Sequence, residues 1–421
     1  MKKGETRVAQ AKPTSPDRIL YLVPAYPAVS ETFVYREIAA LQGRGKQIGL
    51  CALYNGEDGA VGTPDLDFVE ILYDRPMWKH VLSSFFEFAH HPWHVMRTKW
   101  TFLGDFLRAG LVTRHAAALA YQFVAAASLA RVLRKRGVQH IHAHFAHSPT
   151  QVAMYAAGFA GIGFSFTGHA NDIYERGVML REKADRATRM VTISDFNRRY
   201  LLDQGVRAEK VSVVRAILEF PHHAPVLRTG QRLKLGSLGR LVGKKGMDTL
   251  LAGLALLEDA ELARISVEIG GDGPQRELLE ELAKPLRTRG AGVTFLGQMP
   301  PEDVSRWMQG LDAFVLACRQ TEDGDVDGIP VVLMEAVATG IPVISTSVSG
   351  VTELIAPDTG GLIGQPDSPG DIARNIRTLM QDPETGLRLA QAAQSRLTAE
   401  FDPQKNIDRL IETAFVKGPA A

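Results

Sequence analysis

The sequence is poor in cysteine: Cys51 and Cys318 are the only two among 421 residues, and they lie far apart along the chain. Two distant cysteines supply neither a disulfide framework nor a cysteine-based zinc site. We therefore expect a protein of a reducing compartment, the cytoplasm, that is stabilised by an apolar core.

The sequence also lacks an excess of charge of either sign, because 48 lysines and arginines face 47 aspartates and glutamates and give a net charge of +1. A chain without a global positive field is not recruited to nucleic acid by electrostatics. We predict no nucleic-acid partner and expect any anionic ligand to be held by a local cluster of cations.

Long apolar runs are missing as well. The most apolar stretch, residues 116–130, is shorter than the roughly 20 residues that cross a bilayer, so we expect no transmembrane helix. Residues 1–17 are polar and basic with no apolar run behind them, which makes a poor secretory signal and predicts a short disordered leader. The overall balance of 45% hydrophobic and 23% charged residues is that of a folded globular protein.

Apolar runs of strand length alternate with helical patterns along the whole chain. The runs are residues 18–23, 47–53, 139–145, 164–167 and 190–193 in the first half, and 233–238, 265–269, 293–296, 313–316 and 342–346 in the second. This alternation predicts an α/β protein with two parallel sheets wrapped by helices. The segment 219–226 is rich in proline and histidine and lacks a period, so we expect a linker there, between domains at 18–220 and 221–399.

One segment, residues 76–111, departs from this alternation. It carries three tryptophans and five phenylalanines among scattered lysines and arginines, at spacings that predict amphipathic helices. Its apolar face meets either the core of the protein or a membrane or lipid-bearing substrate, and the sequence leaves both interpretations open.

The first chemically informative motif is Leu238-Gly-Arg-Leu-Val-Gly-Lys-Lys-Gly-Met247. A strand ends there, Gly239 and Arg240 open a loop, and Lys245 stands just before a helical pattern. An arginine fork, a lysine and free amides at a helix start are suited to a diphosphate. The alternative is a solvated basic turn.

The second motif is Asp323-Gly-Asp-Val-Asp-Gly-Ile-Pro-Val-Val-Leu-Met-Glu335. Its acidic start invites a calcium interpretation, but the glutamate comes one position too late for a calcium-binding EF-hand loop. Pro330 suits the first turn of a helix, so Gly328, Ile329 and Val331 would present backbone to a phosphate. Asp327 and Glu335 would then hydrogen-bond the hydroxyls of a sugar nucleotide.

These motifs, in this order, resemble the retaining glycosyltransferases of family 4, in the branch of colanic-acid and exopolysaccharide biosynthesis. The Gly-Arg-x4-Lys-Gly motif of that family is met at Gly239, Arg240, Lys245 and Gly246, and its Glu-x7-Glu motif is met with aspartate first, at Asp327 and Glu335. The stretches Ser30-Glu-Thr-Phe-Val-Tyr-Arg-Glu37 and Ser165-Phe-Thr-Gly-His-Ala-Asn-Asp-Ile-Tyr174 also resemble that branch. The resemblance covers about residues 18–415.

The resemblance implies a GT-B fold, in which two Rossmann-like domains face each other across a cleft and the last helix, within residues 400–421, returns to the N-terminal domain. It implies that Arg240 and Lys245 hold the donor diphosphate, that Glu335 holds the ribose, that Asp327 contacts the donor sugar, and that His169 stands at the reaction centre. We take Gly271 and Gly273 as part of a nucleotide-facing turn, although a plain strand-to-helix turn fits them nearly as well.

On the acceptor side we place Ser30, Glu31 and Thr32, at the start of the first helix, and His144 at a strand end. His140, His142 and His144 share one face of a strand and so are weighed as ligands of zinc or copper. No acidic or water-filled fourth position can be located from the sequence, so we predict no metal and no cofactor.

The activity implied is transfer of a sugar, with retained configuration, from a nucleoside-diphosphate sugar to a glycan or lipid-linked glycan, by a cytoplasmic enzyme that is peripheral to the inner membrane face if residues 76–111 meet lipid. An epimerase would need an acid and base pair at the anomeric carbon, and a phosphorylase would need a lysine-bound cofactor and a longer chain. A non-catalytic sugar-nucleotide-binding scaffold is the remaining alternative.

Overall fold

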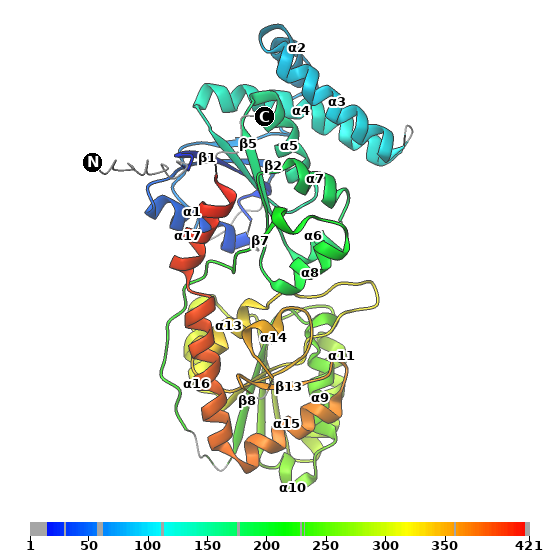
Figure 1. Ribbon diagram of the computed structural model, residues 1–421. Helices are drawn as coiled ribbons and strands as arrows, with labels where there is room; N and C mark the ends of the chain where they lie inside the picture. The colour runs from blue at the N-terminus through cyan, green and yellow to red at the C-terminus, as the bar shows by residue number, and fades with distance from the viewer. Residues whose placement is uncertain are drawn as a thin grey trace, which may run out of the picture.

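The computed structural model describes residues 15–28, 31–56, 62–110, 113–174, 177–227, 230, 232–357 and 359–416. Within these residues the chain forms two parallel sheets, each covered by helices, and the two domains are stacked end to end (Figure 1). The predicted linker lies between the last strand of the first sheet and the first strand of the second. The prediction of two Rossmann-like α/β domains is confirmed.

The N-terminal sheet has seven strands in the order β3-β2-β1-β4-β5-β6-β7, and all its pairings are parallel. The strands are β1 (Arg18–Tyr26), β2 (Gln47–Asn55), β3 (Val69–Ile71), β4 (His140–His144), β5 (Gly163–Gly168), β6 (Met190–Thr192) and β7 (Val211–Val213). The helices are α1 (Thr32–Gly43), α2 (Met77–His90), α3 (Pro92–Ala109), α4 (Arg114–Arg136), α5 (Ser148–Ala160), α6 (Ala170–Tyr174), α7 (Leu180–Arg186) and α8 (Asp195–Asp203).

The C-terminal sheet has six strands in the order β10-β9-β8-β11-β12-β13, again all parallel. The strands are β8 (Leu233–Leu238), β9 (Ile265–Gly270), β10 (Gly292–Gly297), β11 (Ala313–Leu316), β12 (Val343–Thr346) and β13 (Leu362–Gly364). The helices are α9 (Met247–Ala255), α10 (Asp259–Leu262), α11 (Arg276–Thr288), α12 (Pro301–Gln309), α13 (Val331–Ala338), α14 (Val351–Leu354), α15 (Pro369–Gln381), α16 (Pro383–Glu400) and α17 (Pro403–Ala414).

Each apolar run predicted as a strand forms one, because strands of a two-sided parallel sheet are buried on both faces and consist of nearly continuous apolar residues. Three strands were not predicted from the sequence: β3, β7 and β13. These three stand at sheet edges and are three residues long. A short edge strand carries too little of the apolar pattern to be recognised.

Helix α4 is longer than the apolar stretch 116–130 that predicted it. The helix runs for 23 residues, so it is long and apolar enough to cross a membrane by length and composition. However, 56% of its apolar window is buried inside the protein, where α4 packs against α2, α3 and α5. It therefore serves as a core helix of the N-terminal domain.

Helix α17 returns to the N-terminal domain and lies beside α1 (Figure 1). Ile407, Leu410 and Phe415 are fully buried in the apolar cluster of the first sheet. Arg44, the residue after α1, forms an ion pair with Asp408 at 2.8 Å. The end of the chain thus completes the core of the domain with which the chain begins.

We expect Phe415→Ala to destabilise the protein by roughly 3–5 kcal/mol, because it empties a fully buried aromatic site. The ring centroid of Phe415 lies 5.4 Å from those of His140 and His142, so the cavity would open beside buried polar groups. Urea unfolding followed by circular dichroism measures the change. Leu278→Ala, at an exposed position of α11, is the matched control, and equal midpoints for the two variants would contradict the assignment.

Candidate active site

The carboxyl ends of the strands in the two sheets face each other. A Cβ at Gly328, after β11, would lie 3.0 Å from Ile193, after β6. The backbone N–H groups of Asp195 and Phe196 donate to Glu353 at 2.9 and 2.7 Å, and Arg215 forms an ion pair with the same carboxylate. Ligands of open α/β sheets bind beyond the carboxyl ends, where the strand order reverses. In these sheets that point lies between β1 and β4 and between β8 and β11.

Lys245 is held just beyond β8 by a one-turn 3-10 helix, Gly243–Lys245, that precedes α9. Gly246 follows with a φ of 63°, and a Cβ there would lie 1.7 Å from the carbonyl oxygen of Ala317. Only glycine fits this close approach. The turn places Lys245 Nζ 2.6 Å from Asp327 Oδ2, so the basic and acidic motifs meet at the same point.

The neighbouring charges are arranged unequally. Lys244 Nζ lies 2.9 Å from Asp325 Oδ1 and 3.5 Å from Asp327 Oδ1. Arg240 is exposed, and no ion pair of its guanidinium is found within the described part of the chain. The site therefore combines an anchored lysine with an arginine that is available to an anion.

The glycine-rich turn after β9 lies against the Arg240 loop. Gly271 has a φ of 113°, and a Cβ on it would lie 1.9 Å from the carbonyl oxygen of Gly239. A Cβ on Gly273 would lie 2.6 Å from the carbonyl oxygen of Leu241. The close contact between these two loops explains why glycine is needed at both positions. The same contact shapes the backbone that carries Arg240.

Helix α13 begins at Val331, with Pro330 as the residue before its first turn rather than within it. The side chain of Ile329 is buried in the C-terminal core, so only its backbone faces the site. Glu335 is half-buried and its pKa is raised by that burial, while the positive charge of Arg36 in α1 acts in the opposite direction. Glu335 thus lies near the N-terminal domain.

His144 and His169 come together at the facing edge of the first sheet. His144 Nδ1 lies 3.3 Å from His169 Nε2, and His144 Nε2 lies 3.1 Å from Glu37 Oε1. The Tyr21 hydroxyl donates to the same carboxylate oxygen at 2.6 Å. These contacts form a chain of polar groups that runs from the buried sheet to His169.

The protonation of this chain follows from its charges. Burial alone would raise the pKa of Glu37, but the charge of His144 and two hydrogen bonds lower it below its ordinary value, so the carboxylate only accepts. Burial lowers the pKa of His169 to about 3, so its ring is neutral. His144 Nε2 therefore carries a hydrogen. Whether His144 Nδ1 also carries one decides whether His169 Nε2 accepts or donates in their contact, and so whether His169 Nδ1 donates or accepts.

His140 and His142 extend the network deeper, where both lie 2.8 Å from the Ser165 hydroxyl and His142 also lies 3.0 Å from Thr167 Oγ1. Glu37, His142 and His144 offer ligand atoms within 4.8 Å of one another, so the fold supplies the acidic neighbour that the sequence analysis had not located. These contacts occupy both ring nitrogens of His142 and of His144.

Asp172 fixes the loops that carry the two outer histidines. One of its oxygens accepts from the backbone N–H of His169 at 2.8 Å, and the other accepts from that of Ala146 at 2.5 Å. Burial raises the pKa of Asp172 to about 6. Lys183, also buried, donates to the Ala146 carbonyl at 2.7 Å, so both backbone polar groups of Ala146 are bonded to buried charged side chains.

Of the predicted acceptor-side residues, Ser30 lies outside the described residues. Glu31 precedes α1, and burial raises its pKa to about 7 while the charge of His144 opposes the shift. Thr32 is the exposed first residue of that helix. No role was predicted for Phe33 and Glu37. The ring of Phe33 contacts His169 and the carboxylate of Glu37 contacts His144. The two residues stand four apart and so share one face of α1, which was the available signal.

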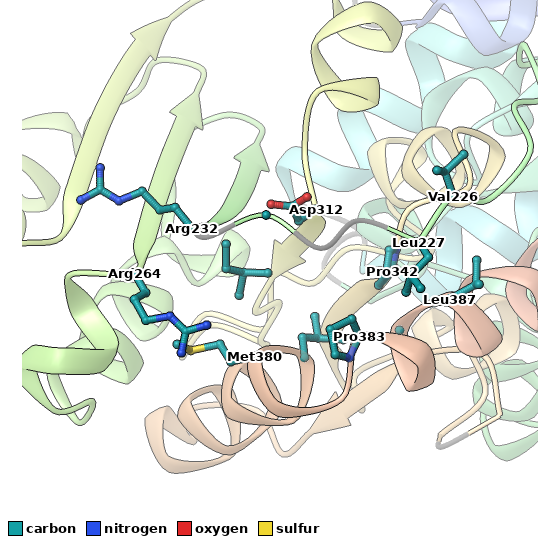
Figure 2. A pocket seen from close by; sticks show the side chains of 13 residues that line it. Val226, Leu227, Arg232, Arg264, Asp312, Pro342, Met380, Pro383 and Leu387 are labelled. Carbon is teal, nitrogen blue, oxygen red and sulfur yellow. The ribbon is translucent and has the colours of Figure 1, made fainter.

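A well-formed cavity lies at the opposite, amino-terminal edge of the second sheet (Figure 2). Its volume is about 190 Å³, and Arg232, Arg264, Asp312, Pro342 and Pro383 line it together with apolar side chains. All of these except Pro383, which begins α16, directly precede strands rather than follow them, so the cavity is separate from Lys245, Asp327 and His169.

Two family models match the chain in tandem. Glycosyltransferase Family 4 matches residues 30–216, and Glycosyl transferases group 1 matches residues 221–396. Together they cover both domains, and they meet at the predicted linker.

One relative matches the chain nearly from end to end, and another matches just over half of it. The protein assigned as colanic acid biosynthesis glycosyltransferase WcaL of Salmonella typhimurium is 26% identical over 402 residues, covering 92% of this chain and 97% of the relative. The amylovoran biosynthesis glycosyltransferase AmsK of Erwinia amylovora is 30% identical over 249 residues, covering 56% of this chain and 59% of the relative.

Solved structures share the fold. Anabaena HepE in complex with UDP has a TM-score of 0.64 and 17% identity, with 94% of this chain and 99% of that chain covered. The lipopolysaccharide outer core galactosyltransferase WaaB has a TM-score of 0.67, 17% identity and the same coverage of both chains.

The buried histidines make the stability depend on pH. Burial lowers the pKa of His140 to about 3, whereas an unfolded histidine titrates at about 6.5. The unfolded chain therefore binds a proton that the folded protein does not bind until the pH approaches 3. As a result His140 reduces stability as the pH falls below about 6.5, by up to about 1.4 kcal/mol per pH unit.

We expect His140→Gln to remove this contribution, so that its free energy of unfolding falls less steeply than that of the wild type between about pH 6 and about pH 4. Urea unfolding across that range measures both slopes. His222→Gln, at an exposed position of the linker, is the matched control. Parallel curves for the wild type and His140→Gln would show that this burial does not govern the acid stability.

Proposed function

The chain belongs to the group 1 and family 4 glycosyltransferases and is of the GT-B type, and on this premise we propose that it is a retaining transferase that moves a sugar from a nucleoside-diphosphate sugar to an acceptor hydroxyl. The observation that carries the proposal is the meeting of Lys245 and Asp327 at 2.6 Å, beyond β8 and β11, beside the exposed Arg240. A diphosphate needs cations at this position and a sugar needs a carboxylate beside them.

The C-terminal domain holds the donor in this proposal. Arg240 and Lys245 bind the diphosphate, backbone amides before α9 and α13 add donors, and Glu335 binds the ribose. UDP and UDP-glucose are bound in structures of Anabaena HepE. For this chain they are the first nucleotides to test, beside guanosine and adenosine diphosphates.

The reaction breaks the bond between the anomeric carbon and the leaving phosphate oxygen. The acceptor oxygen attacks the same face of the sugar, and its proton passes to that phosphate oxygen. Arg240 and Lys245 stabilise the negative charge that develops on the diphosphate, which is the largest electrostatic demand of the step. The two cations meet this demand without a metal ion, so we propose a metal-independent reaction.

His169 and Asp327 orient the donor sugar from opposite domains. The neutral ring of His169 exchanges hydrogen bonds with a sugar hydroxyl, and its direction is set by His144 and Glu37. Asp327, whose carboxylate lies 2.6 Å from Lys245 Nζ, accepts from another hydroxyl. Closure of the two domains around the donor excludes water and so limits hydrolysis.

The acceptor is a lipid-linked oligosaccharide of exopolysaccharide biosynthesis in this proposal, and the enzyme works at the inner face of the cytoplasmic membrane. The relatives from colanic acid and amylovoran biosynthesis support the pathway class. We place the acceptor on the N-terminal domain, beside Glu31, Thr32 and His144.

We expect one nucleotide of a uridine, guanosine and adenosine diphosphate panel to bind, equally well with and without a chelator. Arg240→Ala and Lys245→Ala should each weaken its binding by roughly 10–100-fold, because each removes a charge-assisted hydrogen bond. Isothermal titration calorimetry measures the dissociation constants.

Lys284→Ala is the matched control, because that lysine is exposed on the same domain and pairs only with Glu281. It should bind the nucleotide like the wild type. Failure of every nucleotide to bind a folded wild-type sample would contradict the donor site, and loss of binding on chelation would contradict metal independence.

A further inference from the structure

Helices α2 and α3 form a hairpin on the N-terminal domain and project from its end away from the C-terminal domain (Figure 1). Their inner sides pack on α4 and α5. Their outer sides carry a dense set of apolar side chains, which we call the hairpin face. It comprises Met77, Trp78, Val81, Leu82, Phe85 and Phe88 of α2, with Trp93, Met96, Trp100, Leu103 and Leu107 of α3.

The hairpin is amphipathic in the reverse of the usual sense. The buried residues of α2 are His80, Ser83 and Glu87, while Phe85 is 70% exposed. Those of α3 are Thr98 and Asp105, and Trp93 is 81% exposed. In a helix of a soluble protein the apolar stripe packs inward. Here the polar stripe is buried, and the aromatic stripe faces outward, where it can contact an apolar surface outside the protein.

Three buried polar residues of the hairpin, His80, Glu87 and Asp105, each have a partner in the body of the domain. His80 Nδ1 lies 2.8 Å from the Ser128 hydroxyl of α4, and Glu87 forms an ion pair with Arg134. Asp105 accepts from Arg186 at 2.7 Å and from the Tyr155 hydroxyl at 3.0 Å. These pairs fix the orientation of both helices, so the outward position of the hairpin face is built into the fold.

The charges around the hairpin face are of one sign. Lys79, Arg97, Lys99 and Arg108 are exposed on the two helices, whereas the hairpin's two acids, Glu87 and Asp105, are buried and paired. Arg108 also lies 3.7 Å from Asp105 and 3.9 Å from Glu182 of α7, and its side chain remains 57% exposed. On α3 the stripe from Trp93 to Leu107 has Arg97 and Arg108 on one flank and Lys99 on the other. Long cationic side chains that flank an apolar stripe reach the phosphates of a lipid surface.

We propose that the hairpin face docks the protein on an anionic bilayer, where the three tryptophans enter the interface and the four cations contact lipid phosphates. The helices have 14 and 18 residues, so each lies in the interface rather than crossing the roughly 20-residue span of a membrane. A second copy of this chain is a poorer occupant, because a symmetric contact places cations against cations with no exposed acid on the hairpin to pair with them.

The docking is independent of the transferase reaction, so its test needs no donor or acceptor. The chain has four tryptophans, and three of them lie on the hairpin face, so intrinsic fluorescence reports on docking directly. The fourth, Trp307, donates to Glu268 in the other domain. The probes are vesicles of phosphatidylcholine alone and vesicles that also contain phosphatidylglycerol.

We expect the full chain to co-sediment with the phosphatidylglycerol vesicles, with a blue-shifted emission that lipids brominated on the upper acyl chain quench. Trp93→Glu/Trp100→Glu should weaken binding roughly tenfold or more, because it places charge in the interface. Lys79→Glu/Lys99→Glu should remove the preference for the anionic vesicles. Leu278→Glu/Leu282→Glu, at exposed positions of α11, is the matched control and should bind like the wild type.

Three outcomes would overturn the proposal: no binding to either vesicle by a folded wild-type sample, equal binding by Trp93→Glu/Trp100→Glu, or a wild-type dimer in solution that this variant dissolves. The last would assign the face to a second copy. Nucleotide binding measured on the same samples separates a failure of docking from a failure of the proposed transferase function.

Discussion

The parallel direction of every strand is the constraint on which the rest of the structure depends. It brings all the carboxyl ends of each sheet to one edge, and the two edges face each other. The residues of the site lie at or beyond the ends of strands: His144 ends β4, His169 follows β5, Lys245 follows β8 and Asp327 follows β11. The glycines at 246 and 271 are required because backbone segments approach each other closely at these strand ends.

The two domains meet this edge with different electrostatics. The C-terminal domain presents lysines 244 and 245 against aspartates 325 and 327, together with the exposed Arg240. The N-terminal domain presents His169, whose ring burial keeps neutral, because taking an imidazolium out of water costs more than its neighbours return. The charged half is suited to a diphosphate, and the neutral half is suited to hydroxyl groups. This division follows from burial and pairing of the side chains rather than from net charge, which is close to zero.

The sequence allowed much of this to be predicted, and the exceptions have physical reasons. Buried central strands are recognisable because both faces need apolar residues, whereas the edge strands β3, β7 and β13 are too short to show a pattern. The cationic and acidic motifs were found because each lies in one continuous stretch. Glu37 was not assigned, since a helix residue meets His144 only through the fold. The hairpin face left two interpretations open, because an amphipathic period gives the angle between polar and apolar stripes but not which of them is buried. The burial of Glu87 and Asp105 decides the orientation.

The most direct test of the account compares His169→Ala with the wild type. The quantity measured is the turnover of the nucleotide sugar that the protein binds, followed as release of the nucleoside diphosphate. Because His169 belongs to the domain opposite the diphosphate site, the account predicts nucleotide binding like that of the wild type and a turnover number reduced roughly tenfold or more. A folded variant with full turnover, or one that has lost nucleotide binding, would contradict a reaction centre assembled from the facing edges of both domains.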